Sequence, residues 1–266
     1  MLQFCALSLL LGVISSTSAL VVTRTTTTVS SNPPGSTPFN IQFSSYKFGT
    51  VSNFLSSHNL SASNYQVGSQ PSTHTFEPAL VNISGGALRL TVKGGTAEGG
   101  DVKCAQVTTG YEVLYANVTT RMKLGKVPGV CSASFFYRND NAEIDIELLS
   151  SYITNSSTSS GVTPGLQFTN QALVAGGQET TAAVPYKFDP TAAFHDYTVV
   201  WTKGQVQFLV DGVLRTTFTT NVPSTPGSWV WNNWSSGNAG WTAGPPQTDN
   251  VLQIKSITGY YFSGSG

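Results

Sequence analysis

Residues 196–218, DYTVVWTKGQVQFLVDGVLRTTF, contain three short runs in which apolar and polar side chains alternate. A period of two places the apolar side chains of each run on one face of a β-strand. Lys203-Gly204 and Asp211-Gly212 separate the runs, and Asp-Gly between alternating segments is a strong hairpin signal. The stretch therefore predicts three consecutive antiparallel strands.

The same alternation extends along much of the chain. ALRLTVKGG (87–95) places Leu88, Leu90 and Val92 on one face, and YEVLYANVTTRMKL (111–124) alternates loosely. No segment keeps a helical spacing of apolar residues over three turns. These features predict an all-β sandwich or barrel built from many short strands.

The composition limits the classes of partner. Charged residues make up 10% of the 266 residues and the net charge is zero, whereas an ordinary soluble domain has about 25% charged residues. We therefore expect neither a nucleic acid nor an anionic membrane surface as a partner, because both require a basic surface. Apolar residues at 39% suffice for a sizeable core. We expect a monomer without a cofactor.

The first residues, MLQFCALSLLLGVISSTSAL, combine an apolar run with small residues. Thr17 and Ala19 suit the −3 and −1 positions of a signal-peptidase site, so residues 1–19 are predicted to be a signal peptide. Residues 20–38 are rich in Thr, Ser and Pro and are interpreted as a flexible lead-in. Residues 39–262 are predicted to form one domain, in a protein that is secreted or held in the cell wall.

Secretion affects the cysteines and the asparagines. Removal of the signal peptide leaves Cys104 and Cys131, an even number in an oxidising compartment. A disulfide between them is predicted and would contribute roughly 3 kcal/mol, with two buried free thiols as the alternative. Asn59, Asn82, Asn117 and Asn155 each begin an N-x-[ST] sequon and are candidate N-glycosylation sites. A fifth sequon starts at Asn233.

NAEIDIELLSS (141–151) places Glu143, Asp145 and Glu147 at every second position. In a strand these three side chains share one face, and the intervening apolar residues enter the core. The alternative is a solvated outer face. Stacked like charges repel each other, however, and the chain avoids charge elsewhere.

A carboxylate pair on one face suits glycoside hydrolysis. The Cα atoms of Glu143 and Glu147 would lie about 13 Å apart along a strand. Inward-leaning side chains can bring their oxygens to about 5–5.5 Å, the separation of a retaining pair. Asp145 between them would then adjust the charge of the two glutamates.

EIDIE resembles the bulge-free active-site strand of glycoside hydrolase family 16, as in lichenases, xyloglucan endotransglycosylases and fungal chitin–glucan transglycosylases. Residues 194–234 (FHDYTVVWTKGQVQFLVDGVLRTTFTTNVPSTPGSWVWNNW) resemble the second half of the lichenase domain, and residues 127–150 resemble secreted fungal members. The resemblance implies a β-jelly roll of the concanavalin A-like lectin/glucanase type, with two curved antiparallel sheets and an open cleft. It further implies that Glu143 is the nucleophile, Asp145 the assisting acid and Glu147 the general acid/base.

The resemblance also implies a set of substrate-binding residues. Phe135 and Tyr137 match cleft aromatics, although they could equally be core residues. No metal is expected, because Ser256 stands where lichenases carry a calcium-binding Asp. The remaining matches to sugar-binding positions are Gln106 (a Glu in many relatives), Gln167, Asn232 and Trp234.

Three functions are compatible with these residues. The first is a secreted, endo-acting retaining hydrolase of β-1,3 and/or β-1,4 glucosidic bonds, with a β-glucan as its polysaccharide partner. The second is a cell-wall glucan/chitin transglycosylase, in which a sugar instead of water takes the covalent intermediate. The third is an inactive carbohydrate-binding module. The complete set of three acids argues against the third function.

Overall fold

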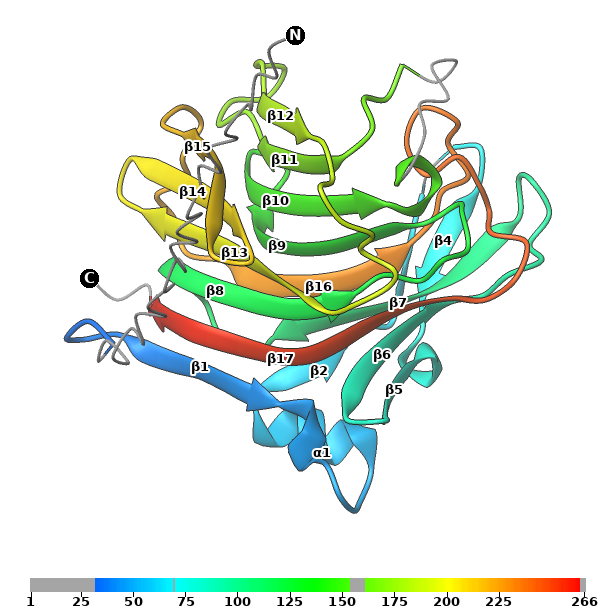
Figure 1. Cartoon of the computed structure of the whole chain (residues 1–266), viewed down its shortest axis with the longest axis horizontal. Coiled ribbons are helices and arrows are strands. Elements are labelled where there is room, and N and C mark those ends of the chain that lie inside the picture. Colours follow the sequence, from blue (N-terminus) through cyan, green and yellow to red (C-terminus); the bar gives the residue numbers. More distant parts are fainter. Residues whose placement is uncertain (1–31, 69, 154–160, 264–266) are drawn as a thin grey trace, which may run out of the picture. The chain divides into compact units, whose positions relative to one another are not determined.

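A computed structural model describes residues 32–68, 70–153 and 161–263. Within these residues the chain forms two sheets packed face to face, which confirms the all-β prediction and decides for a sandwich over a barrel (Figure 1). The strands run from Thr37 to Phe262, close to the predicted domain at 39–262. The predicted signal peptide and residues 20–31 of the lead-in lie outside the described residues.

The eight-stranded sheet has the order β15-β14-β13-β8-β17-β6-β5, with β1 paired to β17. The nine-stranded sheet has the order β12-β11-β10-β9-β16-β7-β4-β3, with β2 paired to β7. The first sheet contains β1 (Thr37–Gln42), β5 (Val81–Ser84), β6 (Ala87–Val92), β8 (Leu114–Lys123), β13 (His195–Thr202), β14 (Gln205–Val210), β15 (Val213–Phe218) and β17 (Asn250–Phe262). The second contains β2 (Leu60–Ala62), β3 (Tyr65–Val67), β4 (Thr73–Phe76), β7 (Asp101–Thr109), β9 (Cys131–Asn139), β10 (Ala142–Leu149), β11 (Leu166–Asn170), β12 (Thr180–Val184) and β16 (Ser228–Trp234).

The hairpins lie where the sequence predicts them. Gly204 joins β13 to β14 with φ +82°. Asp211 and Gly212 join β14 to β15 with φ +50° and +75°, which is the left-handed pair that a two-residue type I′ turn requires. Among the described strands, β4 and β7 form the one parallel pair; the other pairs are antiparallel, as expected of this sandwich.

The core between the sheets contains three buried tryptophans. The exposed fraction of Trp201, Trp229 and Trp231 is 1% or less, which assigns both Trp229 and Trp231 of β16 to the core. Each indole N–H finds an acceptor, as a buried indole must. The acceptors are Pro223 O for Trp201, Ser134 Oγ for Trp229 and Thr120 Oγ1 for Trp231.

Helical structure is minor in the described residues. Within the described ranges the one α-helix, α1 (Val51–Ser57), begins after Thr50, whose side chain accepts a hydrogen bond from the backbone N–H of Asn53. Short 3₁₀ turns cover Phe43–Ser45, Pro78–Leu80 and Ser150–Tyr152. In the described part of the chain no helix has the length and apolar character to cross a membrane.

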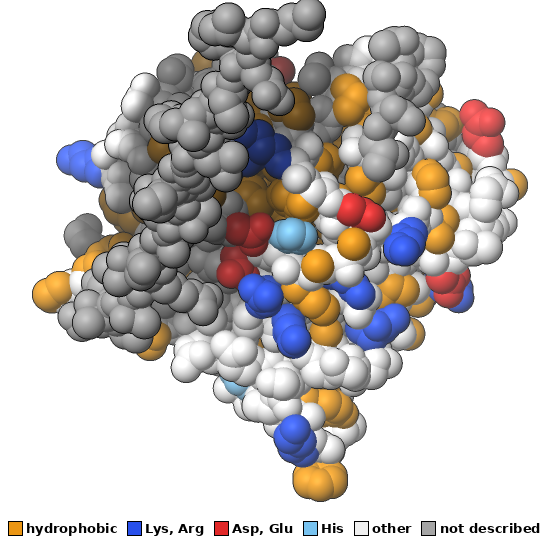
Figure 2. All heavy atoms as spheres, in the orientation of Figure 1, with side chains coloured by type: hydrophobic (Ala, Val, Ile, Leu, Met, Phe, Trp, Pro, Cys, Tyr) orange, Lys and Arg blue, Asp and Glu red, His pale blue; other side chains and the backbone are white. Residues whose placement is uncertain are grey.

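Charged groups are sparse on the surface, and some of them form ion pairs. Arg121 lies 3.0 Å from Asp196 and Lys93 lies 2.6 Å from Asp249. Figure 2 shows acidic and basic side chains next to one another between hydrophobic and uncharged ones, without a large patch of one sign on the viewed face. Such exposed pairs contribute little to stability, typically less than about 1 kcal/mol each.

The sequons fall in different environments. Asn59 and Asn82 are exposed, Asn117 is half-buried, and Asn155 lies outside the described residues. Asn233 is fully buried: its Oδ1 accepts from Ser132 Oγ at 2.7 Å, and its Nδ2 donates to backbone carbonyls including that of Leu90 at 3.0 Å. Glycosylation at Asn233 is incompatible with this packing.

The predicted disulfide is absent. Within the described residues Cys104 and Cys131 are both free, buried thiols. Cys104 is on β7 and Cys131 is on β9, and β16 lies between these strands, with Trp234 opposite Cys131. Two strand spacings separate the Cα atoms by about 10 Å, whereas a disulfide spans at most about 7 Å. The even number of cysteines predicted a disulfide, but a count of cysteines does not show that a strand lies between them.

We predict that the folded chain keeps both thiols. Unfolding without reductant, followed by alkylation and peptide mapping, should recover Cys104 and Cys131 as two separately alkylated peptides. The folded chain should react far more slowly with thiol reagents than the unfolded chain, because both sulfurs are buried. Recovery of one cross-linked peptide pair would contradict the structure.

Candidate active site

The three acids of β10 lie on one face of the nine-stranded sheet. Ile144, Ile146 and Leu148 are completely buried in the core between the sheets, so Glu143, Asp145 and Glu147 point to the opposite face. The pairing of β10 with β9 shifts register only between Ala142 and Glu143 and is regular from Glu143 to Leu149. The alternation predicted from the sequence is thus confirmed. The two glutamates are half-buried and Asp145 is 3% exposed, which rules out a solvated outer face.

Cross-strand pairing aligns each acid with residues of the neighbouring strands. Glu143 is opposite Tyr137, and Asp145 is opposite Phe135. Glu147 is opposite Ala133 on β9 and Gln167 on β11. Directly opposite residues share a face, with Cβ atoms about 5 Å apart. The acids therefore face the same space as Phe135, Tyr137 and Gln167.

A cavity of about 520 Å³ lies on the β9 side of the acids. Phe135 is half-buried and Tyr137 is 36% exposed, so these aromatics line the cavity and do not belong to the core. Aromatic faces of this kind bind the C–H surfaces of ligands. The other lining residues are Ser63, Tyr65, Val67, His74, Phe76, Gln106, Thr108, Ser228, Val230, Asn232 and Trp234.

Two buried amides lie in the wall of this cavity. Gln106 Nε2 donates to Ser63 Oγ and to Tyr65 OH, both at 2.8 Å. Both amide hydrogens are therefore used within the protein, and Gln106 holds Tyr65 at the edge of the cavity. Asn232 Nδ2 is 3.5 Å from Gln106 Oε1, and Asn232 Oδ1 has no hydrogen-bond partner among the described residues. An acceptor without a partner is a natural contact for a ligand hydroxyl.

Trp234 is fixed by a histidine. The rings of His74 and Trp234 stack with their centroids 5.1 Å apart. Burial lowers the pKa of His74 from 6.5 to about 4, against the opposing attraction of Asp101. The imidazole is therefore neutral at neutral pH, and it supports Trp234 by ring contact.

A second cavity, of about 400 Å³, lies on the β11 side of the acids. Gln167 lines it, and its Nε2 donates to Thr163 O at 2.8 Å and to Gly165 O at 3.1 Å. Trp241, from the loop between β16 and β17, lines the same cavity and donates a side-chain hydrogen bond to Glu147. Since β10 lies between β9 and β11, the acids lie between the two cavities.

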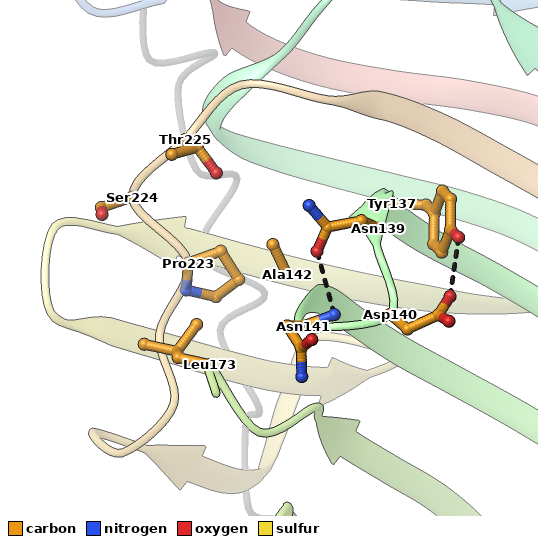
Figure 3. Close-up of a pocket in the computed structure, with 9 residues that line it drawn as sticks. All are labelled: Tyr137, Asn139, Asp140, Asn141, Ala142, Leu173, Pro223, Ser224 and Thr225. Carbon is orange, nitrogen blue, oxygen red and sulfur yellow. Dashed lines mark hydrogen bonds between the residues drawn. The ribbon is translucent and has the colours of Figure 1, made fainter. Parts of the chain in front are cut away.

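A third cavity, of about 610 Å³, lies at the turn between β9 and β10 (Figure 3). Its lining includes Tyr137, Asn139, Asp140, Leu173 and Pro223. The hydroxyl of Tyr137 donates to Asp140 Oδ1 at 2.8 Å. Because Tyr137 also lines the first cavity, its ring forms the border between these two spaces.

Burial raises the pKa of all three carboxyl groups. Desolvation is the largest cause in each case, and repulsion between the acids adds to it for Glu143 and Asp145. The pKa of Glu143 is raised from 4.5 to about 7, that of Asp145 is raised well above 3.8, and that of Glu147 is raised. Three carboxylates in such a space cannot all be ionised near neutral pH.

A hydrogen bond between Asp145 and Glu143 distributes the protons. The bond raises the pKa of Asp145 and lowers that of Glu143. Asp145, which is the more deeply buried, is therefore the donor and keeps its proton, and Glu143 is the acceptor and the more readily ionised group. Gln171 Nε2 donates to Asp145 Oδ2 at 3.4 Å. The site thus contains the carboxylate of Glu143, which accepts a hydrogen bond from the neutral Asp145. Glu147, two positions after Asp145, is a separate acid.

The sequence interpretation missed part of this site. Ser63, Tyr65, His74 and Phe76 also line the first cavity, and none of them was predicted as a site residue from the sequence. Ser63 and Tyr65 lie two positions apart, as do His74 and Phe76, but β3 and β4 are only three and four residues long, too short for a period of two to stand out in the sequence. Trp241 had a usable signal, because a large aromatic residue in the Gly/Ser/Pro-rich stretch SSGNAGWTAGPP (235–246) has no strand pattern to explain it.

The model of the family described as "Glycosyl hydrolases family 16" matches residues 63–251, more than half of the chain. The chain therefore belongs to this family. The jelly-roll sandwich that the resemblance implied is the fold of its structural neighbours.

Individual relatives show how far the likeness extends. The beta-glucanase of Paenibacillus polymyxa is 32% identical over 137 residues, which is 50% of this chain and 52% of that protein. The match thus spans about half the length of this relative. The solved Bacillus licheniformis beta-glucanase has a TM-score of 0.63 at 21% identity, over 86% of this chain and 99% of that one. A lichenase from a mouse hindgut metagenome has a TM-score of 0.64 at 20% identity, over 84% and 98%.

The raised pKa values predict how stability depends on pH. The folded state keeps the Asp145 proton to a higher pH than the unfolded chain, so its contribution is full below pH 3.8 and is lost as pH rises toward the folded pKa. Asp145→Asn keeps a hydrogen-bond donor and removes the ionisation. Its melting temperature should therefore exceed that of the wild type by a few degrees at pH 8, and the difference should disappear near pH 4.

Asp189→Asn is the matched control for this measurement. Hydrogen bonds from Thr191 lower the pKa of the exposed Asp189, so this replacement should not raise the melting temperature at pH 8. An Asp145→Asn variant whose difference from the wild type is the same at pH 4 and pH 8 would contradict a raised pKa.

Phe135 and Trp234 line the first cavity and are not fully buried, so their replacement should weaken ligand binding more than it lowers the melting temperature. If the first cavity binds a soluble β-glucan, Phe135→Ala and Trp234→Ala should each raise KM for it about tenfold, because each removes a stacking face from this cavity. Trp231→Ala is the control, since this ring is fully buried and its loss should mainly lower the melting temperature. Steady-state kinetics and thermal unfolding distinguish the two effects. Unchanged KM with a collapsed melting temperature at Phe135 would show a core residue.

Proposed function

We propose that this chain is a secreted, endo-acting retaining β-glucan hydrolase. The observation that carries the proposal is the row of three acids between two cavities, with Asp145 hydrogen-bonded to Glu143. A polysaccharide that crosses the row would place a glycosidic bond at the acids and sugar rings on both sides. Sites open at both ends suit cleavage within a chain.

The proposed reaction is a double displacement in which each acid has its own task. Glu143 attacks the anomeric carbon as a carboxylate while Glu147 protonates the departing glycosidic oxygen, which leaves a glycosyl-enzyme ester. Water, deprotonated by Glu147, then attacks this ester and frees Glu143. Asp145 donates to Glu143 before and after the attack and so stabilises the ionised leaving carboxylate.

The names of relatives support the substrate class. Those reported above are called beta-glucanases or lichenases, and the Rhizobium meliloti relative, 26% identical over 145 residues, is an "Endo-1,3-1,4-beta-glycanase ExoK". A β-glucan is uncharged, which agrees with a chain of zero net charge that binds through aromatic faces and amides. We propose β-1,3 and/or β-1,4 glucosidic bonds as the bonds cleaved.

The second cavity favours a second candidate reaction, transglycosylation. Trp241 and Gln167 line a space next to Glu147 that could hold an incoming sugar. A sugar hydroxyl would then take the glycosyl group in place of water. Analysis of the products from mixed-linkage glucan and laminarin, by mass and chain length, distinguishes the two reactions: hydrolysis gives only shorter chains, and transfer gives longer ones as well.

Rescue experiments test the separate roles of the glutamates. Glu143→Ala should abolish turnover of glucan, and azide or formate should restore attack on an activated β-glucosyl fluoride with an inverted product. Glu147→Ala should still form the glycosyl-enzyme from a substrate with a good leaving group, and azide should speed its breakdown with retention of configuration. The measurements are the anomeric configuration of the product and burst kinetics. Losses that no anion rescues in either folded variant would contradict the assignment.

A further inference from the structure

Glu147 makes two side-chain hydrogen bonds to residues outside its own strand. The thiol of Cys131, on β9, donates to Glu147 Oε1 at 3.2 Å. The indole N–H of Trp241 donates to Glu147 and also interacts with the sulfur of Cys131. The proposed hydrolysis gives neither residue a role.

The thiol is built into an apolar cluster at the end of the acid row. Cys131 is completely buried and packs with Leu149 and Tyr152, and Trp241 lies against the same cluster. Burial raises the pKa of the Cys131 thiol well above 9.0, with repulsion from Glu147 adding to the effect. The sulfur therefore keeps its hydrogen and acts as a donor across the pH range in which the acids titrate.

The second buried thiol has no such contact. Cys104 Sγ donates to the backbone carbonyl of Val102 at 3.5 Å. Its apolar cluster contains Phe76, Val92 and Val130 and none of the acids. The chain thus contains two buried thiols of similar burial, of which one contacts a carboxyl group of the site.

The bond to Oε1 has a geometric consequence. With the thiol hydrogen directed at Oε1, the proton destined for the glycosidic oxygen must be carried by Oε2. Hydrogen bonds to a carboxylate favour its ionised form. The two donors therefore oppose the effect of burial on Glu147. A retaining acid/base needs this balance, because it must be protonated in the first step and ionised in the second.

We propose that Cys131 and Trp241 are positioning residues for Glu147, which orient its carboxyl group toward the glycosidic bond and set the pH range in which it holds its proton. The inference rests on the proposed function, because it assumes that Glu147 is the acid/base.

The other groups that face Glu147 do not account for this tuning. On its own strand the titratable neighbours are Asp145, which keeps its proton, and Glu143, whose negative charge would disfavour ionisation of Glu147. From β11 the opposite residue is Gln167, whose amide does not titrate and is engaged with backbone carbonyls. From β9 the facing titratable group is the Cys131 thiol itself. Among the described neighbours, the hydrogen-bond donors to Glu147 are thus Cys131 and Trp241.

The test is the pH profile of kcat/KM on a soluble β-glucan. Cys131→Ala and Trp241→Phe each remove one donor, so the pKa of Glu147 should rise and the alkaline limb should move to higher pH by about 0.5 to 1 unit. The value of kcat near neutral pH should fall about threefold to tenfold, since the second step needs ionised Glu147. Cys131→Ser keeps a donor and should return the limb toward its wild-type position.

Cys104→Ala is the matched control, because it removes a buried thiol without touching the acids. Its alkaline limb should coincide with that of the wild type, and its melting temperature calibrates the loss of a buried sulfur. An alkaline limb that stays in place or moves to lower pH in Cys131→Ala and Trp241→Phe would overturn the inference. If Cys131→Ala does not fold, Trp241→Phe decides the question by the same criterion, while Cys131→Ser should keep its alkaline limb near the wild-type position.

The inference and the proposed function fail in different ways. Loss of turnover in Glu147→Ala, with azide rescue, together with an unmoved limb in Cys131→Ala and Trp241→Phe, removes only the positioning role. Normal turnover in Glu147→Ala removes the acid/base assignment, and the positioning role with it. A shifted limb together with azide rescue of Glu147→Ala supports both.

Discussion

The burial of three carboxyl groups on β10 depends on the apolar residues between them. Ile144, Ile146 and Leu148 are completely buried against the second sheet. A shift of the strand by one residue would move these side chains to the cleft face and drive all three acids into the core. The cost of such a change, several kcal/mol for each ion, fixes the register of β10. The same register then aligns each acid with its partner on β9.

Differences in depth give the three acids different properties. Asp145 lies deepest and keeps its proton, so that Glu143 can accept a hydrogen bond as the ionised member of the pair. Glu147 instead borders an apolar cluster and receives its hydrogen bonds from other strands and loops. Carboxyl groups on one strand thus differ in their pKa values because their neighbours differ. A row of acids on an exposed strand could not separate in this way, because water would equalise their pKa values.

The surroundings of the acids agree with an uncharged polymer as ligand. The first cavity combines Tyr137, Phe135 and Trp234 with buried amides, and His74 beside Trp234 is neutral. Ring faces and amides bind sugars through dispersion and hydrogen bonds, without a need for a charged surface. A chain with 10% charged residues can therefore bind such a ligand along its sheet. Apart from Ser63, the lining residues come from β3, β4, β7, β9 and β16, whose order in the sheet differs from their order in the chain.

The sequence by itself determined the strands, the Asp211-Gly212 hairpin and the shared face of Glu143, Asp145 and Glu147, because these follow from a period of two and from local turn geometry. Only the tertiary structure decided which distant strands are neighbours. It placed β16 between the two cysteines, which excludes the predicted disulfide, and it brought Tyr65 and Trp241 to the site from segments in which no period of two stands out. Strand order depends on contacts between residues far apart in the chain, and local periodicity does not encode those contacts.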